Sequence, residues 1–351
     1  MWHGIYGHDR LVDRFRQSLA KGRLGSSYLF LGEAGIGKHT LALKLAQGLL
    51  CQGSAEDQLD PCGQCESCRL MEAGNHPDLD LVGLPAGKRW LPVDLFIGDR
   101  DHRHKVGLCH NIAMRPMLGR RRVAIIDDAD HLTTESANSL LKTLEEPPPG
   151  AVLILIGTSR SRQLPTILSR TQVIRFSVLP TDVVADLLIQ QEIAADQAQA
   201  TALAQMAEGT LDRANELADP ELWQFRERIA QQFAPQSFDS IRLGTELTAL
   251  VSTAGKEPEA RRRRLRSIFH LVGDHFRQVL HSSCSMMSES GEPQPLAGEQ
   301  FDPTAQGSAL AVLDRCLEAE EQLDRNANQA TLLECWLDDL AEILTQSLAI
   351  R

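Results

Sequence analysis

The stretch Gly32-Glu33-Ala34-Gly35-Ile36-Gly37-Lys38 has the residue types and spacing of a phosphate-binding loop. It lies between an apolar run at 28–31, typical of a buried strand, and a helical pattern at 41–46. Glycines let successive backbone N–H groups curl round an anion, and a helix N-terminus and Lys38 add positive charge. We therefore predict a nucleotide site that uses Gly32, Gly35, Gly37 and Lys38, against the alternative of a glycine turn without a ligand.

The residue after the lysine normally supplies a hydroxyl that binds Mg²⁺ in such loops. Here that residue is His39, and the hydroxyl of Thr40 comes one position later, turned by about 100° on a helix. We assign His39 and Thr40 to the edge of the nucleotide site. Because Mg²⁺ prefers oxygen ligands, we expect ATP to bind weakly or moderately, with a defective place for Mg²⁺.

Two acids follow the apolar run 123–126, and a threonine follows the run 152–156. In phosphate-loop proteins an acid at the end of such a strand meets Mg²⁺, and the next acid orients the attacking water. Asp127 is the candidate metal contact and Asp128 the candidate base, although its side chain is one methylene shorter than that of a glutamate. Thr158 is the candidate sensor of the terminal phosphate. The alternative for all three is a solvated residue at a strand end.

Four cysteines lie close together in the sequence at Cys51, Cys62, Cys65 and Cys68. Zinc takes four thiolates in a tetrahedron, and closely spaced cysteines on turns supply them. No open ligand position is evident, so the pattern predicts a structural zinc rather than a catalytic one. An iron–sulfur cluster and unligated thiols are the alternatives, and unligated thiols fit the other four, scattered cysteines better.

The 351 residues have the composition of a globular protein, with 42% hydrophobic and 24% charged residues. We expect a cytoplasmic location, because no apolar segment approaches about 18 residues and the N-terminus lacks the features of a signal peptide. A net charge of −11 argues against the whole chain being an electrostatic DNA binder. Local contact with DNA phosphates through the arginines at 120–122 or 261–266 stays open. The alternatives are that these arginines lie on solvated helix faces or form salt bridges between subunits.

Apolar runs at 28–31, 79–82, 123–126 and 152–156 alternate with helical patterns, which predicts a parallel sheet covered by helices. The stretch 84–110 lacks periodicity and is interpreted as an insertion or long loop that leads into a helix ending near Met114. After Pro180 only helical patterns remain. They lie at 181–218, 223–234, 239–252, 258–281, 309–325 and 328–349. Residues 282–308 are rich in Ser, Gly, Pro and Glu, and we expect a long or disordered loop there.

These pieces, in this order, resemble the AAA+ clamp-loader family of bacteria. The run 138–148, with the sequence NSLLKTLEEPP, and the run 164–170, with the sequence LPTILSR, are similar to two motifs of that family. The cysteines inserted after the phosphate-loop helix look like those of its gamma/tau and delta-prime subunits. Asn326-Ala327-Asn328 resembles part of its collar domain. The absence of an extension past the collar favours the delta-prime type over tau.

The resemblance implies an α/β AAA+ domain at 1–178 with a zinc module at 51–68. It also implies a small helical lid at 179–220 and an all-α collar at 221–351. Arg170 would be an arginine finger that stabilises charge on the phosphate bound by a neighbouring subunit. Arg213 lies near a second nucleotide sensor of the family. The implied partners are the gamma/tau and delta subunits of DNA polymerase III, with the sliding clamp and primer-template DNA contacted through the complex.

Two other functions stay open at this point. A gamma-type motor subunit would hydrolyse ATP, which His39 and Asp128 argue against. A free-standing, zinc-bearing nucleotide kinase would need an acceptor site and a lid, and we find neither in the sequence. The sequence does not decide whether the loop holds ATP in the cell, the order of subunits in a ring, or the role of 84–110.

Overall fold

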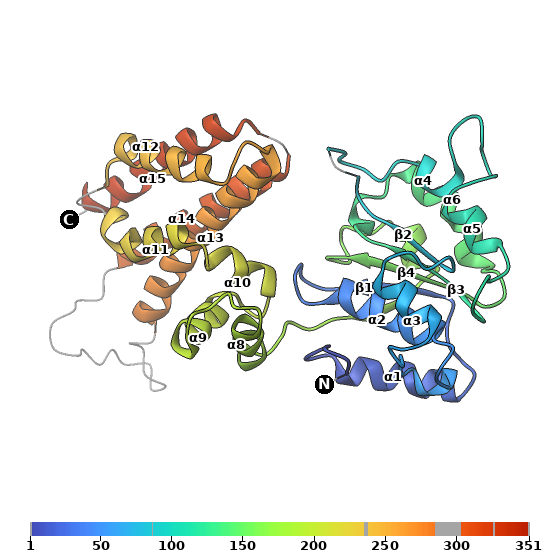
Figure 1. Ribbon diagram of the computed structural model, residues 1–351. Coiled ribbons are helices and arrows are strands. Elements are labelled where there is room, and N and C mark those ends of the chain that lie inside the picture. The colour runs from blue at the N-terminus through green and yellow to red at the C-terminus, as the bar shows by residue number, and fades with distance from the viewer. Residues whose placement is uncertain (1, 86, 235–237, 285–302, 326, 350–351) are drawn as a thin grey trace. The chain divides into compact units, whose positions relative to one another are not determined.

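The computed structural model describes the chain except residues 1, 86, 235–237, 285–302, 326 and 350–351 (Figure 1). The chain divides into two compact units, Met1–Asp212 and Arg213–Arg351, and each is described by itself. The boundary falls inside a short helix, α10. The finer division into domains at 1–178, 179–220 and 221–351 stays a prediction.

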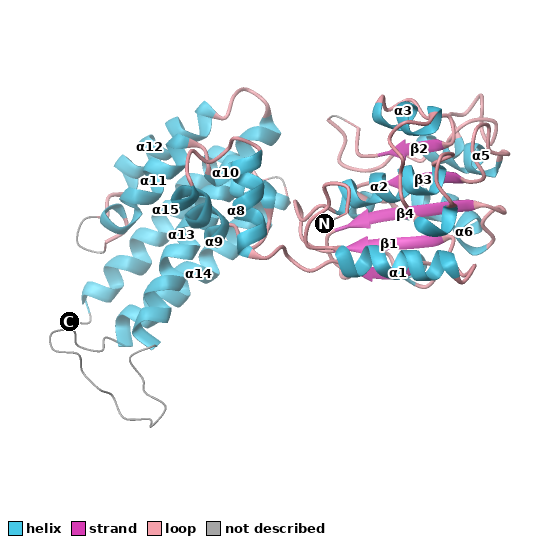
Figure 2. Ribbon diagram, turned by 60° about the horizontal axis from the view of Figure 1, so that its bottom comes forward, coloured by secondary structure: helices cyan, strands magenta, loops and turns pink. Residues whose placement is uncertain are grey.

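The first unit contains a five-stranded sheet in the order β2-β3-β4-β1-β5, in which all neighbouring strands are parallel (Figure 2). Its strands are β1 (Ser27–Leu31), β2 (Leu79–Val82), β3 (Arg122–Ile126), β4 (Ala151–Gly157) and β5 (Gln172–Arg175). The first four are confirmed where the apolar runs predict them, within a residue or so at each end. The fifth strand, β5, was not predicted from the sequence. It has four residues, and only Ile174 of its side chains is fully buried, so it lacks the apolar run of a central strand.

Helices cover both faces of this sheet. Their bounds are α1 (Asp9–Ala20), α2 (Lys38–Leu50), α3 (Glu66–Glu72), α4 (Asp94–Ile97), α5 (Leu108–Ala113), α6 (Thr134–Glu145) and α7 (Pro165–Leu168), with 3₁₀ turns η1 (Glu56–Gln58) and η2 (Ala129–His131). Tyr28 and Phe30 of β1 pack in one core with α1 and α2, while Leu29 and Leu31 pack in the other with α4 to α7. The alternation follows from the two-residue period of a strand.

The stretch 84–110 is more ordered than the sequence analysis expected. It contains α4 and the start of α5, and Leu91, Phe96 and Ile97 are buried in the core beneath the sheet. The long-loop interpretation was therefore wrong for this part, because short apolar groups anchor the backbone although no helical period is visible. The helix expected to end near Met114 ends at Ala113.

The remaining helices of the chain begin in the first unit with α8 (Thr181–Gln190), α9 (Gln197–Met206) and α10 (Leu211–Leu217). Those of the second unit are α11 (Pro220–Gln232), α12 (Ser240–Thr253), α13 (Pro258–Cys284), α14 (Pro303–Asp324) and α15 (Gln329–Ala349). The fully buried Trp336 packs against Phe269 and Phe233, with ring centroids 4.8 and 6.2 Å away. Asp219 and Asp239 cap α11 and α12 by accepting hydrogen bonds from backbone N–H groups in the first turn.

Helices occupy both ends of the stretch 282–308, for which a loop was expected. Helix α13 continues to Cys284, and α14 begins at Pro303, a residue that is well suited to the first turn of a helix. Residues 285–302, on which most of that expectation falls, lie outside the described residues. Among the described residues, no helix is both long and apolar enough to cross a membrane.

Candidate nucleotide and metal sites

The phosphate-binding loop connects β1 to α2, as the sequence predicts. Gly35 and Gly37 have positive φ angles of 73° and 91°, which favour glycine, and Gly37 is the N-cap of α2. A Cβ on Gly32 would lie 2.6 Å from Ile36 Cδ1 and 2.9 Å from the carbonyl oxygen of Phe176. The loop therefore packs too closely on its surroundings for a larger residue at position 32.

Lys38 is the first residue of α2, and its ammonium group lies within the loop. Nζ donates to the carbonyl oxygen of Gly32 at 2.7 Å and also to that of Glu33. Burial lowers the pKa of Lys38, while the charges of Asp127 and Asp130 act in the opposite direction. The lysine is thus held at the centre of the cradle, near the acids that follow β3.

His8, which the sequence analysis did not assign to the site, supports the loop from outside. Its Nε2 atom donates to the carbonyl oxygen of Ile36 at 2.7 Å, and its ring meets Phe176 edge-on at 4.8 Å. Burial lowers the pKa of His8, so the neutral imidazole is favoured. A histidine just before a helix has no distinctive pattern, so no sequence signal identified this role.

His39 points toward the acid at the end of β3. Its Nδ1 atom lies 2.7 Å from Oδ2 of Asp127. The hydrogen bond with Asp127 raises the pKa of His39. Burial opposes ionisation of Asp127, but the hydrogen bond and charge of His39 outweigh it and hold the pKa of that carboxyl below its usual range. Thr40 is exposed on α2 one position further on.

The candidate base, Asp128, has a left-handed backbone with φ of 54°. Its Oδ2 atom accepts a hydrogen bond from the backbone N–H of Leu84 at 3.2 Å. Two residues later, Asp130 accepts hydrogen bonds from the N–H and the hydroxyl of Thr158, at 2.8 and 2.7 Å, and another from Gln163. Asp130 was not among the predicted site residues. Asp130, rather than Asp128, therefore positions Thr158, the candidate sensor of the terminal phosphate.

Arg170 lies at the amino-terminal end of the parallel strands, whereas the phosphate loop lies at their carboxyl-terminal end. The loop follows the carboxyl end of β1, whereas Arg170 precedes the amino end of the parallel neighbour β5. Its guanidinium donates to Glu145 Oε1 from Nε at 2.6 Å, and to Thr166 O and Ser169 Oγ from Nη1 at 3.1 and 2.9 Å. The topology thus separates this arginine from the phosphate loop of its own chain.

Arg213 is the last residue of the expected site. Its Nη2 atom lies 2.6 Å from Oδ2 of Asp274 on α13, and both side chains are largely buried. The structure thus brings Lys38, His39 and Asp127 together, while Arg170 lies at the opposite end of the strands. Arg213 forms an ion pair within the second unit.

The four cysteines converge as the spacing predicts. The sulfur atoms of Cys51, Cys62, Cys65 and Cys68 all lie within 4.8 Å of one another. A zinc–sulfur distance of about 2.3 Å in a tetrahedron requires sulfurs about 3.8 Å apart, and the Cys51–Cys65 distance is 3.9 Å. The donor set therefore fits a structural zinc ion.

Backbone N–H groups favour thiolates in this cluster, whereas burial raises the pKa of Cys68. The N–H groups of Cys62, Cys65 and Cys68 each donate to a sulfur of the cluster, all at 3.4 Å. Burial opposes ionisation of Cys65, but hydrogen bonds from the N–H groups of Cys68 and Gln52 lower its pKa to about 6. Gly53 permits the close packing, since a Cβ there would lie 2.6 Å from the sulfur of Cys62.

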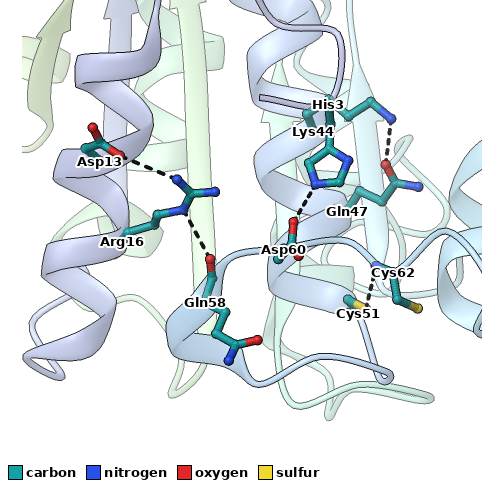
Figure 3. Close-up of polar contacts among 9 residues, drawn as sticks. All are labelled: His3, Asp13, Arg16, Lys44, Gln47, Cys51, Gln58, Asp60 and Cys62. Atoms are coloured by element: carbon teal, nitrogen blue, oxygen red, sulfur yellow. Dashed lines mark hydrogen bonds and ion pairs between the residues drawn. The ribbon is translucent and has the colours of Figure 1, made fainter. Parts of the chain in front are cut away.

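The loop between Cys51 and Cys62 is attached to the N-terminal part of the chain (Figure 3). His3 Nε2 lies 2.5 Å from Asp60 Oδ1, and Arg16 Nε donates to the carbonyl oxygen of Gln58 at 3.2 Å. These contacts fix the loop from which Cys62 approaches Cys51. The sequence gives no indication of them, because residues 3 and 60 are far apart in the chain.

Behind the cluster lies a buried polar chain that the sequence analysis also missed. Ser67 donates to the carbonyl oxygen of Leu50 at 2.7 Å, and His76 Nε2 lies 2.8 Å from Ser67 Oγ. His76 Nδ1 accepts the N–H of Asp78 at 3.0 Å. Ser67 precedes one cysteine and Leu50 precedes another, so these hydrogen bonds tie the cysteine cluster to the start of β2.

Comparisons with known proteins agree with this arrangement. Residues 7–180 match the family model described as "DNA polymerase III, delta subunit". The chain is 35% identical over 194 residues to the DNA polymerase III subunit delta' of Bacillus subtilis. The aligned part is 54% of this chain and 54% of that relative. It is 40% identical over 144 residues to the corresponding subunit of Pseudomonas aeruginosa, covering 41% of this chain and 40% of the relative.

A second group of relatives matches a longer part of the chain. The DNA polymerase III subunit tau of Escherichia coli is 29% identical over 316 residues, which covers 88% of this chain and 46% of the relative. The chain thus spans about half the length of the curated relatives it matches, or somewhat less.

Proposed function

Because the chain belongs, through residues 7–180, to the DNA polymerase III delta subunit family and is related to gamma and tau clamp-loader subunits, we propose that it works as a delta-prime subunit. In this role it helps a ring-shaped loader to place the sliding clamp on primer-template DNA. Its direct partners are the gamma/tau and delta subunits, and it meets the clamp and DNA through the complex.

The proposal includes an arginine finger in trans. What supports it is the position of Arg170 at the end of the parallel strands opposite the chain's own phosphate loop. A guanidinium there is useful to catalysis only if it faces a nucleotide bound by another subunit. Its bonds to Glu145, Thr166 and Ser169 hold the side chain in one orientation before a partner arrives. Such preorganisation is what a fixed positive charge in a transition state requires.

The proposal also includes weak or absent ATP hydrolysis by this chain itself. Asp127, which would hold Mg²⁺, is already bonded to His39, and Asp128 is bonded to the backbone of Leu84. Neither acid is arranged to bind a metal ion or to orient a water molecule. The four-cysteine cluster has a structural role in this account, holding the end of α2, the loop after it and α3 together around a zinc ion.

The competing candidate is a gamma-type motor subunit. The similarity to tau over 88% of this chain favours it, as do Gly32, Gly35, Gly37 and Lys38, which form an intact loop. The two candidates differ in one measurable property, steady-state ATP hydrolysis by the isolated chain compared with the chain mixed with gamma/tau and delta subunits.

Under our proposal, the isolated chain hydrolyses ATP no faster than its Lys38→Ala variant. Adding the chain to its partner subunits raises the rate at which those subunits hydrolyse ATP. Robust turnover by the isolated chain, abolished by Lys38→Ala, would assign it to the motor class instead.

A further inference from the structure

The place that Mg²⁺ takes in phosphate-loop proteins is filled in this chain by one of its own side chains. Mg²⁺ needs oxygen ligands in octahedral geometry, and the family supplies a hydroxyl after the lysine and an acid at a strand end. Here the residue after the lysine is His39, and its Nδ1 atom lies 2.7 Å from Oδ2 of that acid, Asp127. The imidazole is therefore bonded where the metal's oxygen ligands should converge.

The neighbouring acids do not restore a metal site. Asp128 Oδ2 accepts the N–H of Leu84, and its backbone is held in the left-handed region. Asp130 is occupied by both donors of Thr158 and by Gln163. All three acids after β3 therefore have partners within the protein, and the residues present do not fit Mg²⁺.

The part of the loop that binds phosphate is intact despite this change. Gly35 and Gly37 adopt the positive φ angles that turn the loop, and α2 is a helix of 13 residues whose N-terminus faces it. Among the described residues, the hydrogen-bond acceptors of Lys38 Nζ are the backbone carbonyl oxygens of Gly32 and Glu33, which a phosphate can replace as partners. Backbone N–H groups, the helix N-terminus and one ammonium group form an anion site that needs no metal.

We propose that this loop binds a nucleoside diphosphate without a divalent cation, with His39 against Asp127 in the place that Mg²⁺ would otherwise take. The inference rests on the proposed function in assigning the loop to nucleotide. A diphosphate suits the site better than a triphosphate, because each further phosphate adds negative charge that Mg²⁺ normally neutralises. Glu33 and Asp212 add to that charge, since Asp212 lies beside Gly35 and a Cβ on that glycine would meet it at 2.6 Å.

The test is binding of fluorescent ADP to the full chain, titrated once with EDTA and once with excess Mg²⁺. We expect the two dissociation constants to agree within about twofold, and His39→Thr to make Mg²⁺ strengthen binding by about tenfold. Dependence of the wild-type chain on Mg²⁺ by tenfold or more would overturn the proposal, and so would the absence of ADP binding under both conditions.

A second measurement on the wild-type chain does not depend on the variant folding. Mn²⁺ is a paramagnetic substitute for Mg²⁺ and broadens the NMR signals of a nearby imidazole. In the ADP complex, the ring signals of His39 should stay sharp when Mn²⁺ is added, and their selective loss would contradict the proposal. Neither outcome affects the role of Arg170, which is tested on the partner's nucleotide, so the two proposals can fail separately.

Discussion

The Nε2 atom of His76 lies 2.8 Å from Oγ of Ser67, in the buried interior behind the cysteine cluster. Ser67 gives its own proton to the carbonyl oxygen of Leu50, so Nε2 is the donor in this pair. On its other side, His76 Nδ1 accepts the N–H of Asp78. Both ring nitrogens are therefore used in a way that only the neutral imidazole permits.

The pH dependence of stability should reflect this arrangement. Burial lowers the pKa of His76, so the unfolded chain binds its proton at higher pH than the folded chain does. This contribution to stability is complete above about pH 6.5 and is lost as pH falls through the folded-state pKa. Urea unfolding between pH 5 and 8 should show a decline below about pH 6.5 that His76→Gln makes shallower.

The His76→Gln variant should still lose some stability at low pH, because burial also lowers the pKa values of His8 and His275. The exposed His104, changed to Gln, is the matched control. An equal slope in wild type and His76→Gln would show that this histidine does not carry the effect.

Metal content should be about one zinc per chain. Purified under reducing conditions, Cys65→Ser should lose most of the metal, because a tetrahedral site loses one of four ligands. Cys335→Ser, at an exposed cysteine on α15, should retain it. Elemental analysis checks both. Less than about half an equivalent in the wild type, or an absorption band typical of an iron–sulfur cluster, would refute the assignment.

Asp130 should matter for stability as well as for the position of Thr158. Asp130→Ala leaves the N–H and the hydroxyl of Thr158 without their shared partner, and Gln163 loses one too. Unsatisfied, partly buried donors cost about 1–3 kcal/mol, which urea unfolding resolves. Asp101→Ala, on an exposed loop, is the control. A change no larger than that of the control would mean that water replaces Asp130 at little cost.

Hydrolysis by the isolated chain should increase when the two departures in the site are reversed. His39→Thr supplies a hydroxyl for Mg²⁺ and frees Asp127, and Asp128→Glu lengthens the arm that would orient water. We expect the double variant to hydrolyse ATP faster than the wild type, with Lys38→Ala removing the gain. Phosphate release is the measurement, and an unchanged rate would place the defect elsewhere in the site.

The fold was predictable where burial produces long apolar runs. Three of the four predicted strands, β1, β3 and β4, are buried along their whole length, because central parallel strands are covered on both faces. The fourth, β2, lies at the sheet edge and was predicted although its side chains are at most partly covered. The short edge strand β5 has no such run and was missed. The anion cradle and the four cysteines are local in sequence, so their spacing identified them.

The contacts that decide how the site works are not local. The bond between His39 and Asp127 joins residues 88 positions apart, and no single-residue pattern signals it. His8, His76 and Asp130 lie among other polar residues in the sequence, and only the fold shows what each one supports. Sequence patterns therefore identified the kinds of site, whereas the partners of each side chain required the structure.

The central claim is that Arg170 acts on the nucleotide of a neighbouring subunit. It is tested most directly by reconstituting the loader with gamma/tau and delta subunits and measuring ATP hydrolysis at the neighbouring site. Arg170→Ala should leave assembly and the unfolding midpoint of this chain nearly unchanged, because a partly exposed ion pair with Glu145 adds little stability. Hydrolysis at that site should fall by about 10³-fold, with Arg103→Ala, in an exposed loop, at the wild-type rate. An Arg170→Ala complex that assembles and hydrolyses ATP at the wild-type rate would contradict the account.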